Sequence, residues 1–275
     1  MINSTSDEPY VGIVIDAYIN ETIEIGSVSH KIGTGVSDAE GFVEIICNGT
    51  SLASIVRAGD WIIQLHRPLQ FVTHANESKR IIQSWSPTLD LKIKGASSVI
   101  GNRAFSRDPK IVSQLSLQAC KGLLSEDVFP IIKHIPGHGR AKVDSHHYLP
   151  IIKSSKKVLQ EDFYPFKKLN KQPFAMIAHI KYLDLDKEKC ATYSEPIISF
   201  IKNKLGFEGI LFSDDLCMKA LKGSYIYRAR NAIKAGCDIV LHCEPNISNI
   251  KKSCEGAGYA SIGLIEKIKE LKAFN

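Results

Sequence analysis

The sequence predicts an α/β protein in which helices cover a parallel β-sheet. In residues 86–275, four apolar runs of strand length alternate with longer segments that have helical spacing. The runs are apolar at successive positions, which is typical of strands buried on both faces. Each run ends in polar or ionisable residues, and parallel α/β folds carry their functional groups at the carboxyl ends of strands. Such a sheet could be open or closed into a barrel.

Strands alone are predicted in the first part of the chain. The expected strands there lie at residues 10–19, 41–47 and 61–65, separated by clusters of Gly, Asn, Ser and Asp that are typical of turns. The later strands are predicted at residues 128–132, 174–180, 209–212 and 237–242. The helices between them are predicted at residues 109–124, 160–169, 195–205 and 225–235.

Composition indicates a globular protein, with 44% hydrophobic and 23% charged residues in a chain of 275. No apolar run approaches the roughly 20 residues of a membrane span, and residues 1–9 lack the pattern of a signal peptide. The seven cysteines include no C-x-x-C pair, which favours reduced thiols. We therefore expect a cytoplasmic protein with no membrane partner.

The formal net charge of +6 divides unevenly along the chain. Residues 1–85 carry five Lys and Arg against ten Asp and Glu, a net of −5, whereas residues 86–275 carry thirty against nineteen, a net of +11. The Lys pairs of the basic part lack interleaved aromatic residues, so we expect solvated helix faces and no binding to nucleic acid.

The densest group of ionisable residues is residues 133–146, KHIPGHGRAKVDSH, whose proline and glycines predict a loop. Asp144 and His146 lie two residues apart, so both can face one side of an extended segment and form a general acid/base pair. His134, His138, Asp144 and His146 could instead bind a metal ion. A polar surface loop is the third interpretation.

A second group, Ser213-Asp214-Asp215, directly follows an apolar run. Adjacent residues of an extended segment face opposite ways, so the two aspartates are predicted to have different roles. One would face the site as nucleophile, base or ligand, and the other would be held by backbone groups or cap the next helix. The alternative is that both are helix caps.

Four motifs together resemble a known family. They are SPTLDL followed by GASSVIGNRAFSRDP (residues 86–109), KHIPGHGRAKVDSH, GFEGILFSDDLCMKAL (residues 206–221) and AGCDIVLHC (residues 235–243). They resemble the cytoplasmic bacterial β-N-acetylhexosaminidases of glycoside hydrolase family 3, TIM-barrel enzymes of peptidoglycan recycling. The resemblance covers roughly residues 84–255, and it displaces the metal-site interpretation.

The resemblance implies a role for individual residues. Asp214 would be the catalytic nucleophile, His146 the general acid/base and Asp144 its partner, giving a double displacement with retention of configuration. A mobile loop of residues 137–143 would bring His146 into the site. The positions that would hydrogen-bond N-acetylglucosamine are Arg103, Lys133 and His134. No metal ion and no cofactor are implied, and the expected substrates are muropeptides that contain N-acetylglucosamine.

The resemblance also implies something that the sequence does not contain. Family members carry an Asp-Gln-Glu-Gly-Gly motif and further strand–helix units upstream, and residues 1–83 have no such motif. A (β/α)₈ barrel typically needs about 250 residues. Residues 84–275 are therefore predicted to be a partial TIM-type barrel that lacks its first strands, after a β-rich segment at residues 1–83. That segment could close the gap, the chain could dimerise, or the protein could be a truncated sugar-binding remnant with little activity.

Two further histidines have open interpretations. His179 lies within a predicted strand and could contact the sugar or be a core histidine with a satisfied ring. His242 lies at a strand end, and we expect a structural role for it. His138 is expected to organise its loop.

Overall fold

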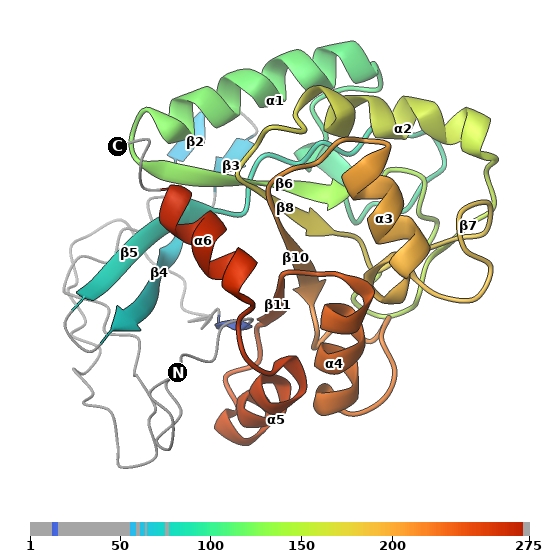
Figure 1. Ribbon diagram of the computed structural model, residues 1–275. Coiled ribbons are helices and arrows are strands. Elements are labelled where there is room, and N and C mark those ends of the chain that lie inside the picture. The colour runs from blue at the N-terminus through green and yellow to red at the C-terminus, as the bar shows by residue number, and fades with distance from the viewer. Residues whose placement is uncertain (1–12, 16–55, 59–60, 64, 75–76, 272–275) are drawn as a thin grey trace.

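The computed structural model describes residues 13–15, 56–58, 61–63, 65–74 and 77–271 (Figure 1). Its centre is a seven-stranded sheet in the order β1-β11-β10-β8-β6-β5-β4, in which β4 runs antiparallel to β5 and all other neighbours are parallel. The strands are β1 (Ile13–Ile15), β4 (Leu65–His74), β5 (Glu77–Ser84), β6 (Val128–Ile135), β8 (Phe174–Ile177), β10 (Ile210–Asp215) and β11 (Ile239–His242). Two small sheets pair β2 (Val56–Ala58) with β3 (Trp61–Ile63) and β7 (Ile151–Ile152) with β9 (Lys181–Tyr182).

Each α-helix begins at a polar residue whose side chain accepts a hydrogen bond from a backbone N–H of the first turn. The helices are α1 (Pro109–Leu124), α2 (Lys156–Lys168), α3 (Glu195–Asn203), α4 (Tyr225–Ala235), α5 (Ile247–Ala257) and α6 (Ile262–Glu270). The caps are Asp108, Ser155, Ser194, Ser224, Asn246 and Ser261. Short 3-10 helices lie at Gly101–Arg103 and Ala191–Tyr193.

The parallel strands separate two apolar cores. Successive strand residues face opposite cores, so Leu211 packs with the helix-facing cluster and Phe212 with the cluster on the other face. On that second face α6 contributes Leu264 and Ile268, and Figure 1 shows α6 in front of the sheet. Within the part of the chain that the structure describes, α6 therefore covers this second face, and the burial of apolar surface stabilises the helix there.

The four strands predicted in the second part are confirmed as parallel strands, and helices α1 and α4 have the predicted bounds. Helix α2 begins four residues earlier than predicted because Ser155 caps it. Helices α5 and α6 were not predicted. Of the N-terminal strands, β1 and β3 lie inside predicted runs, and the predicted strand at residues 41–47 lies outside the described residues.

The region before residue 84 contributes strands to the same sheet. β1 pairs in parallel with β11, and β5 pairs in parallel with β6 and antiparallel with β4. The sheet thus continues across residue 83, where the resemblance predicts the end of the N-terminal segment, and that boundary stays a prediction.

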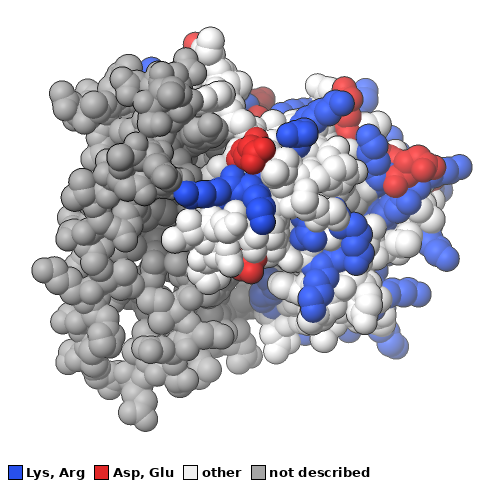
Figure 2. Space-filling model, turned by 90° about the horizontal axis from the view of Figure 1, so that it is seen from below, with Lys and Arg blue, Asp and Glu red and all other residues white. Residues whose placement is uncertain are grey.

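Basic side chains are spread over the surface. Figure 2 shows Lys and Arg over much of the described part of one face, with a few Asp and Glu among them. Lys156, Lys157, Lys167 and Lys168 are exposed on α2, as expected for a solvated helix. In the described residues no helix is long and apolar enough to cross a membrane.

Candidate active site

The two aspartates at the end of β10 have different partners. The Asp215 carboxylate accepts hydrogen bonds from the backbone N–H groups of Cys217 (2.9 Å) and Cys243 (3.0 Å). Neither aspartate caps a helix, because α4 begins after Ser224. The prediction of two roles is confirmed for Asp215, which joins two backbone segments, and Asp214 is left for the site.

Asp214 is a half-buried carboxylate that stays ionised. Burial raises its pKa, but the electrostatic interaction with His134 and a hydrogen bond from the Asp215 N–H (2.8 Å) outweigh burial, so the pKa lies below its usual range. The Lys133 ammonium acts in the same direction. A carboxylate that remains unprotonated can act as a nucleophile or stabilise a positive charge.

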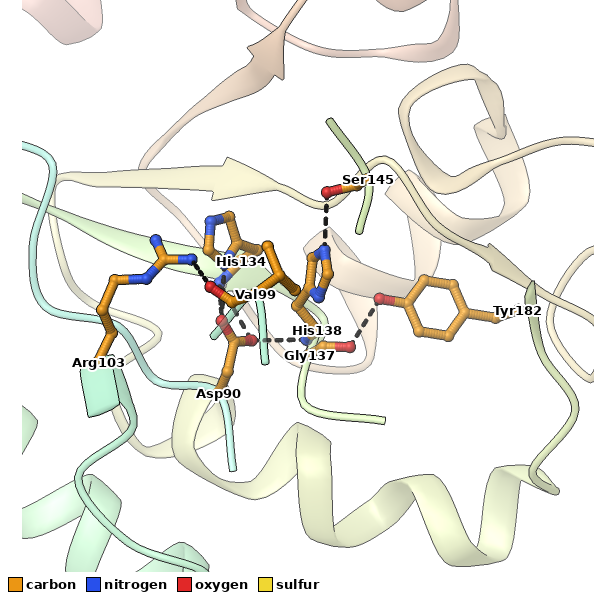
Figure 3. A network of polar contacts seen from close by, with 8 residues as sticks. All are labelled: Asp90, Val99, Arg103, His134, Gly137, His138, Ser145 and Tyr182. Carbon is orange, nitrogen blue, oxygen red and sulfur yellow. Dashed lines mark hydrogen bonds and ion pairs between the residues drawn. The ribbon is translucent and has the colours of Figure 1, made fainter. Parts of the chain in front are cut away.

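His134 and His138 are organised by Asp90, a buried residue whose role the sequence did not predict (Figure 3). One Asp90 oxygen lies 2.7 Å from His134 Nδ1, and the other accepts the backbone N–H of His138 at 2.6 Å. Burial raises the Asp90 pKa, but the charge and hydrogen bond of His134 lower it by a larger amount. The net shift of the pKa is therefore downward. Asp90 thus fixes the histidine that is predicted to bind the sugar.

The His138 ring is buried and hydrogen-bonds Ser145 through Nε2 at 3.0 Å. Burial and, after it, repulsion from His134 lower the His138 pKa to about 4, so the ring is neutral at pH 7. Its ring centroid lies 5.3 Å from that of His134. These contacts agree with the expected role of His138 in organising the loop.

The first part of the predicted mobile loop is anchored. Residues 136–139 and Ala141 are buried, Tyr182 donates a hydrogen bond to the Gly137 carbonyl (2.9 Å), and the Arg140 guanidinium pairs with Glu161 and Asp162 of α2. A Cβ at Gly139 would lie 2.2 Å from the Leu91 carbonyl oxygen, so only glycine fits. The exposed part of the loop comes later, at residues 142–148, where only Asp144 and Ser145 are less exposed.

His146 lies in this exposed part and pairs with Asp144. Its Nδ1 lies 2.7 Å from the Asp144 carboxylate, which also accepts the His146 backbone N–H at 2.9 Å. Burial raises the Asp144 pKa, but the hydrogen bonds and charge of His146 hold it below its usual range. The His146 carbonyl accepts the Lys219 N–H at 3.1 Å, which ties this loop to the segment after Asp214. The predicted Asp–His pair is therefore formed, with Nε2 of His146 left for proton transfer.

The other predicted sugar ligands lie on neighbouring segments. Lys133 precedes His134 in β6 and is half-buried, and Arg103 is exposed at the end of the 3-10 helix Gly101–Arg103. The Arg103 guanidinium donates to the Val99 carbonyl at 2.6 Å (Figure 3).

His179 is a buried histidine with both ring nitrogens in use. Its Nε2 lies 3.0 Å from the Asp215 carbonyl, which only accepts, so Nε2 carries the proton and Nδ1 accepts from the Thr192 hydroxyl at 2.6 Å. Burial lowers its pKa and keeps it neutral. The core interpretation of His179 is therefore the one that the structure supports.

The metal site considered for residues 133–146 is not assembled. Among the described residues, the one group of three or more potential ligands within 4.8 Å of one another is Cys217, His242 and Glu244.

The parallel sheet and the charged groups at its strand ends define a barrel-type α/β domain with its polar site at the carboxyl end of the strands. Residues 72–264 match the glycosyl hydrolase family 3 N terminal domain, and the chain belongs to this family.

Known relatives support this assignment. A β-hexosaminidase from Bordetella avium (strain 197N) is 38% identical over 165 residues, which are 58% of this chain and 47% of that protein. One from Thioalkalivibrio sulfidiphilus (strain HL-EbGR7) is 40% identical over 164 residues, with the same two shares. The chain therefore spans about half the length of the curated relatives it matches.

Solved structures give the same result. NagZ from Neisseria gonorrhoeae in complex with N-trifluoroacetyl-D-glucosamine superposes with a TM-score of 0.60 at 33% identity, covering 69% of this chain and 55% of that one. A family 3 β-N-acetylglucosaminidase from Paenibacillus sp. str. FPU-7 gives 0.64 at 26% identity, covering 70% and 39%.

Proposed function

We propose that the protein is a retaining β-N-acetylhexosaminidase that removes terminal N-acetylglucosamine from peptidoglycan fragments. The observation that carries the proposal is the position of Asp214, a half-buried carboxylate at the end of a central parallel strand, next to His134 and Lys133, which lower its pKa. The names of the relatives and the His146–Asp144 pair support the same chemistry.

In the proposed reaction, an Asp214 oxygen attacks the anomeric carbon and the bond to the leaving oxygen breaks. His146 Nε2 gives its proton to that oxygen, and a glycosyl ester on Asp214 results. In the second step His146 takes a proton from water, whose oxygen displaces Asp214. Asp144 accepts the Nδ1–H and stabilises the imidazolium that donates its proton in the first step and re-forms in the second.

The proposed sugar contacts are Arg103, Lys133 and His134. Asp90 would fix the direction of the His134 ring, so that Nε2 faces the sugar in one orientation. The basic surface would weakly favour anionic muropeptides. Cys120, Cys190, Cys217 and Cys237 are free thiols, which supports our proposal that the protein acts in the cytoplasm.

A trapping experiment tests the proposal directly. The full chain is assayed with an aryl β-N-acetylglucosaminide and then incubated with an activated 5-fluoro derivative of N-acetylglucosamine. We expect turnover, and mass spectrometry should find the sugar on a peptide that contains Asp214. Asp214→Asn should abolish both signals while its thermal melt stays cooperative. Turnover equal to that of Asp214→Asn would refute the proposal.

A second candidate function is a sugar-binding protein with little activity, and the partial coverage of the relatives favours it. In this case the TIM-type barrel lacks its first strands. N-acetylglucosamine would then raise the melting temperature of the wild type without any measurable hydrolysis or label. An Arg103→Ala variant should lose that upward shift.

A further inference from the structure

A second cluster of reactive side chains lies between the ends of β10 and β11. Cys217 follows β10, His242 ends β11 and Glu244 follows it, and one ligand atom from each lies within 4.8 Å of the other two. None of the three has a part in the proposed hydrolysis.

In this cluster, the imidazole of His242 has one ring nitrogen without a hydrogen-bond partner. Its side chain is fully buried, and Nε2 has no hydrogen-bond partner. Nδ1 lies 2.8 Å from the Ser253 hydroxyl, and when Nδ1 donates to Ser253 the Nε2 lone pair is free. A buried nitrogen without a partner is costly, and metal-binding histidines usually donate their other ring N–H to a neighbour in this way.

Glu244 is oriented by two donors. Its Oε2 accepts from the Tyr225 hydroxyl at 2.7 Å and from the Asn249 side-chain amide at 2.9 Å. These bonds leave Oε1 available and restrict where it can lie. Such outer contacts typically orient a ligating carboxylate.

The backbone around the cluster is already held together. The Asp215 carboxylate accepts the N–H groups of Cys217 and Cys243, and the Leu216 N–H donates to the Leu241 carbonyl at 2.8 Å. A tetrahedral Zn²⁺ with bonds of about 2.3 Å to sulfur and 2.0 Å to nitrogen places those atoms about 3.5 Å apart. The ligand atoms lie within 4.8 Å of one another, and rotation of the half-buried Cys217 and Glu244 side chains can bring them to the shorter separation.

We propose that Cys217, His242 and Glu244 form a Zn²⁺ site that joins the loop after β10 to the loop after β11. One sulfur, one imidazole nitrogen and one carboxylate oxygen favour zinc over Mg²⁺ or Ca²⁺, which prefer oxygen ligands. Three protein ligands leave the fourth position to water. The ion would brace the strand end that carries Asp214 through a bond outside the sugar site.

Metal binding to the full chain tests this site without any measurement of hydrolysis. The reduced protein is freed of metal with a chelator and titrated with Co²⁺, whose complexes with a thiolate absorb by charge transfer, and then with Zn²⁺. The variants are Cys217→Ser, His242→Gln and Glu244→Gln, and Cys243→Ser is the matched control, since this neighbouring cysteine is outside the cluster.

We expect one Co²⁺ per chain with a thiolate charge-transfer band in the wild type and in Cys243→Ser, displaced by Zn²⁺. The band should vanish in Cys217→Ser. His242→Gln and Glu244→Gln should bind at least about 10-fold more weakly, because even outer partners of a metal site typically contribute that much. Zn²⁺ should raise the melting temperature of the wild type and not that of Cys217→Ser.

Two results would overturn the site: absence of the band in the wild type, or a band that Cys217→Ser retains. If a buried variant does not fold, as judged by circular dichroism, Glu244→Gln decides alone, and unchanged affinity in it refutes the assignment. The outcome is independent of the proposed glycosidase activity, which the trapping experiment tests separately.

Discussion

Gly139→Ala should lower both the free energy of unfolding and kcat. The loss should be larger than for a methyl group added at any other position of the loop. The added Cβ would lie 2.2 Å from the Leu91 carbonyl oxygen and 3.0 Å from the Leu91 nitrogen, so the two backbones must separate by about 1 Å to reach ordinary contact. Their neighbours, His138 and Asp90, share a 2.6 Å hydrogen bond that this separation stretches.

The magnitude follows from two costs. Overpacking a close contact costs about 1–3 kcal/mol. Weakening a hydrogen bond to a buried carboxylate costs about 1.5–3 kcal/mol. We therefore expect a loss of roughly 3–5 kcal/mol in the free energy of unfolding, and a displacement of about 1 Å in a catalytic group should lower kcat about 100-fold.

Urea unfolding measures the stability change, and turnover of the aryl β-N-acetylglucosaminide measures kcat. Gly122→Ala is the matched control, since this glycine lies in α1 with nothing within 4 Å of an added Cβ. It should gain up to about 1 kcal/mol from helix propensity and leave kcat unchanged. A Gly139→Ala protein within about 0.5 kcal/mol of the wild type, with normal kcat, would show that the loop contact is not what holds Asp90 and His138 in place.

Three further outcomes are expected. Because the His138 pKa is lowered to about 4 from an unfolded value near 6.5, the unfolded chain binds the proton first. The free energy of unfolding should therefore fall by up to about 3 kcal/mol as the pH drops from 6.5 to 4, and urea titrations of His138→Gln should show a shallower fall. Leu264→Ala should cost about 2–5 kcal/mol in thermal melts, whereas Ile262→Ala, exposed on the same helix, should cost almost nothing, and equal losses would contradict the packing of α6. Asp144→Asn should lower kcat about 10²–10⁴-fold by losing the carboxylate that holds His146, which a pH–rate profile with unchanged kcat would disprove.

The sequence predicted those parts of the fold that depend on local pattern. Buried parallel strands are apolar throughout, and α1 and α4 carry clear periodicity between capping residues, so their bounds were predicted correctly. The start of α2 was missed because the first two residues after the cap Ser155 are lysines, which carry no apolar pattern. Helices α5 and α6 follow the caps Asn246 and Ser261 and were not predicted, because no predicted strand comes after them to mark the alternation of strands and helices.

In the candidate active site, too, the residues that are close in sequence could be predicted and those that meet over a long sequence distance could not. The pairs Asp214 with Asp215 and Asp144 with His146 are local in sequence, and their alternation and spacing indicate which way they face. Asp90 was missed as a functional residue because its partner His134 lies 44 residues away, and only the adjacent position of β6 brings them together. An aspartate between two leucines, as in SPTLDL, is the signal that could have suggested a buried carboxylate with a partner.

The number of residues in a barrel is a weaker argument against activity than the packing of its inner face. The strand that carries Asp214 is stable only if Phe212, which faces away from α1 to α4, is covered, and in this chain it packs edge-on against Trp85 and Phe174. Helix α6 completes that cluster with Leu264 and Ile268, and β1 pairs with β11 at the edge of the sheet. These residues of the chain itself cover the sheet face on which Phe212 lies, and this packing would keep the end of β10 in place. Activity then depends on contacts to the sugar, not on the number of strands, so a stable Arg103→Ala protein that has lost turnover would point to binding groups as the limit.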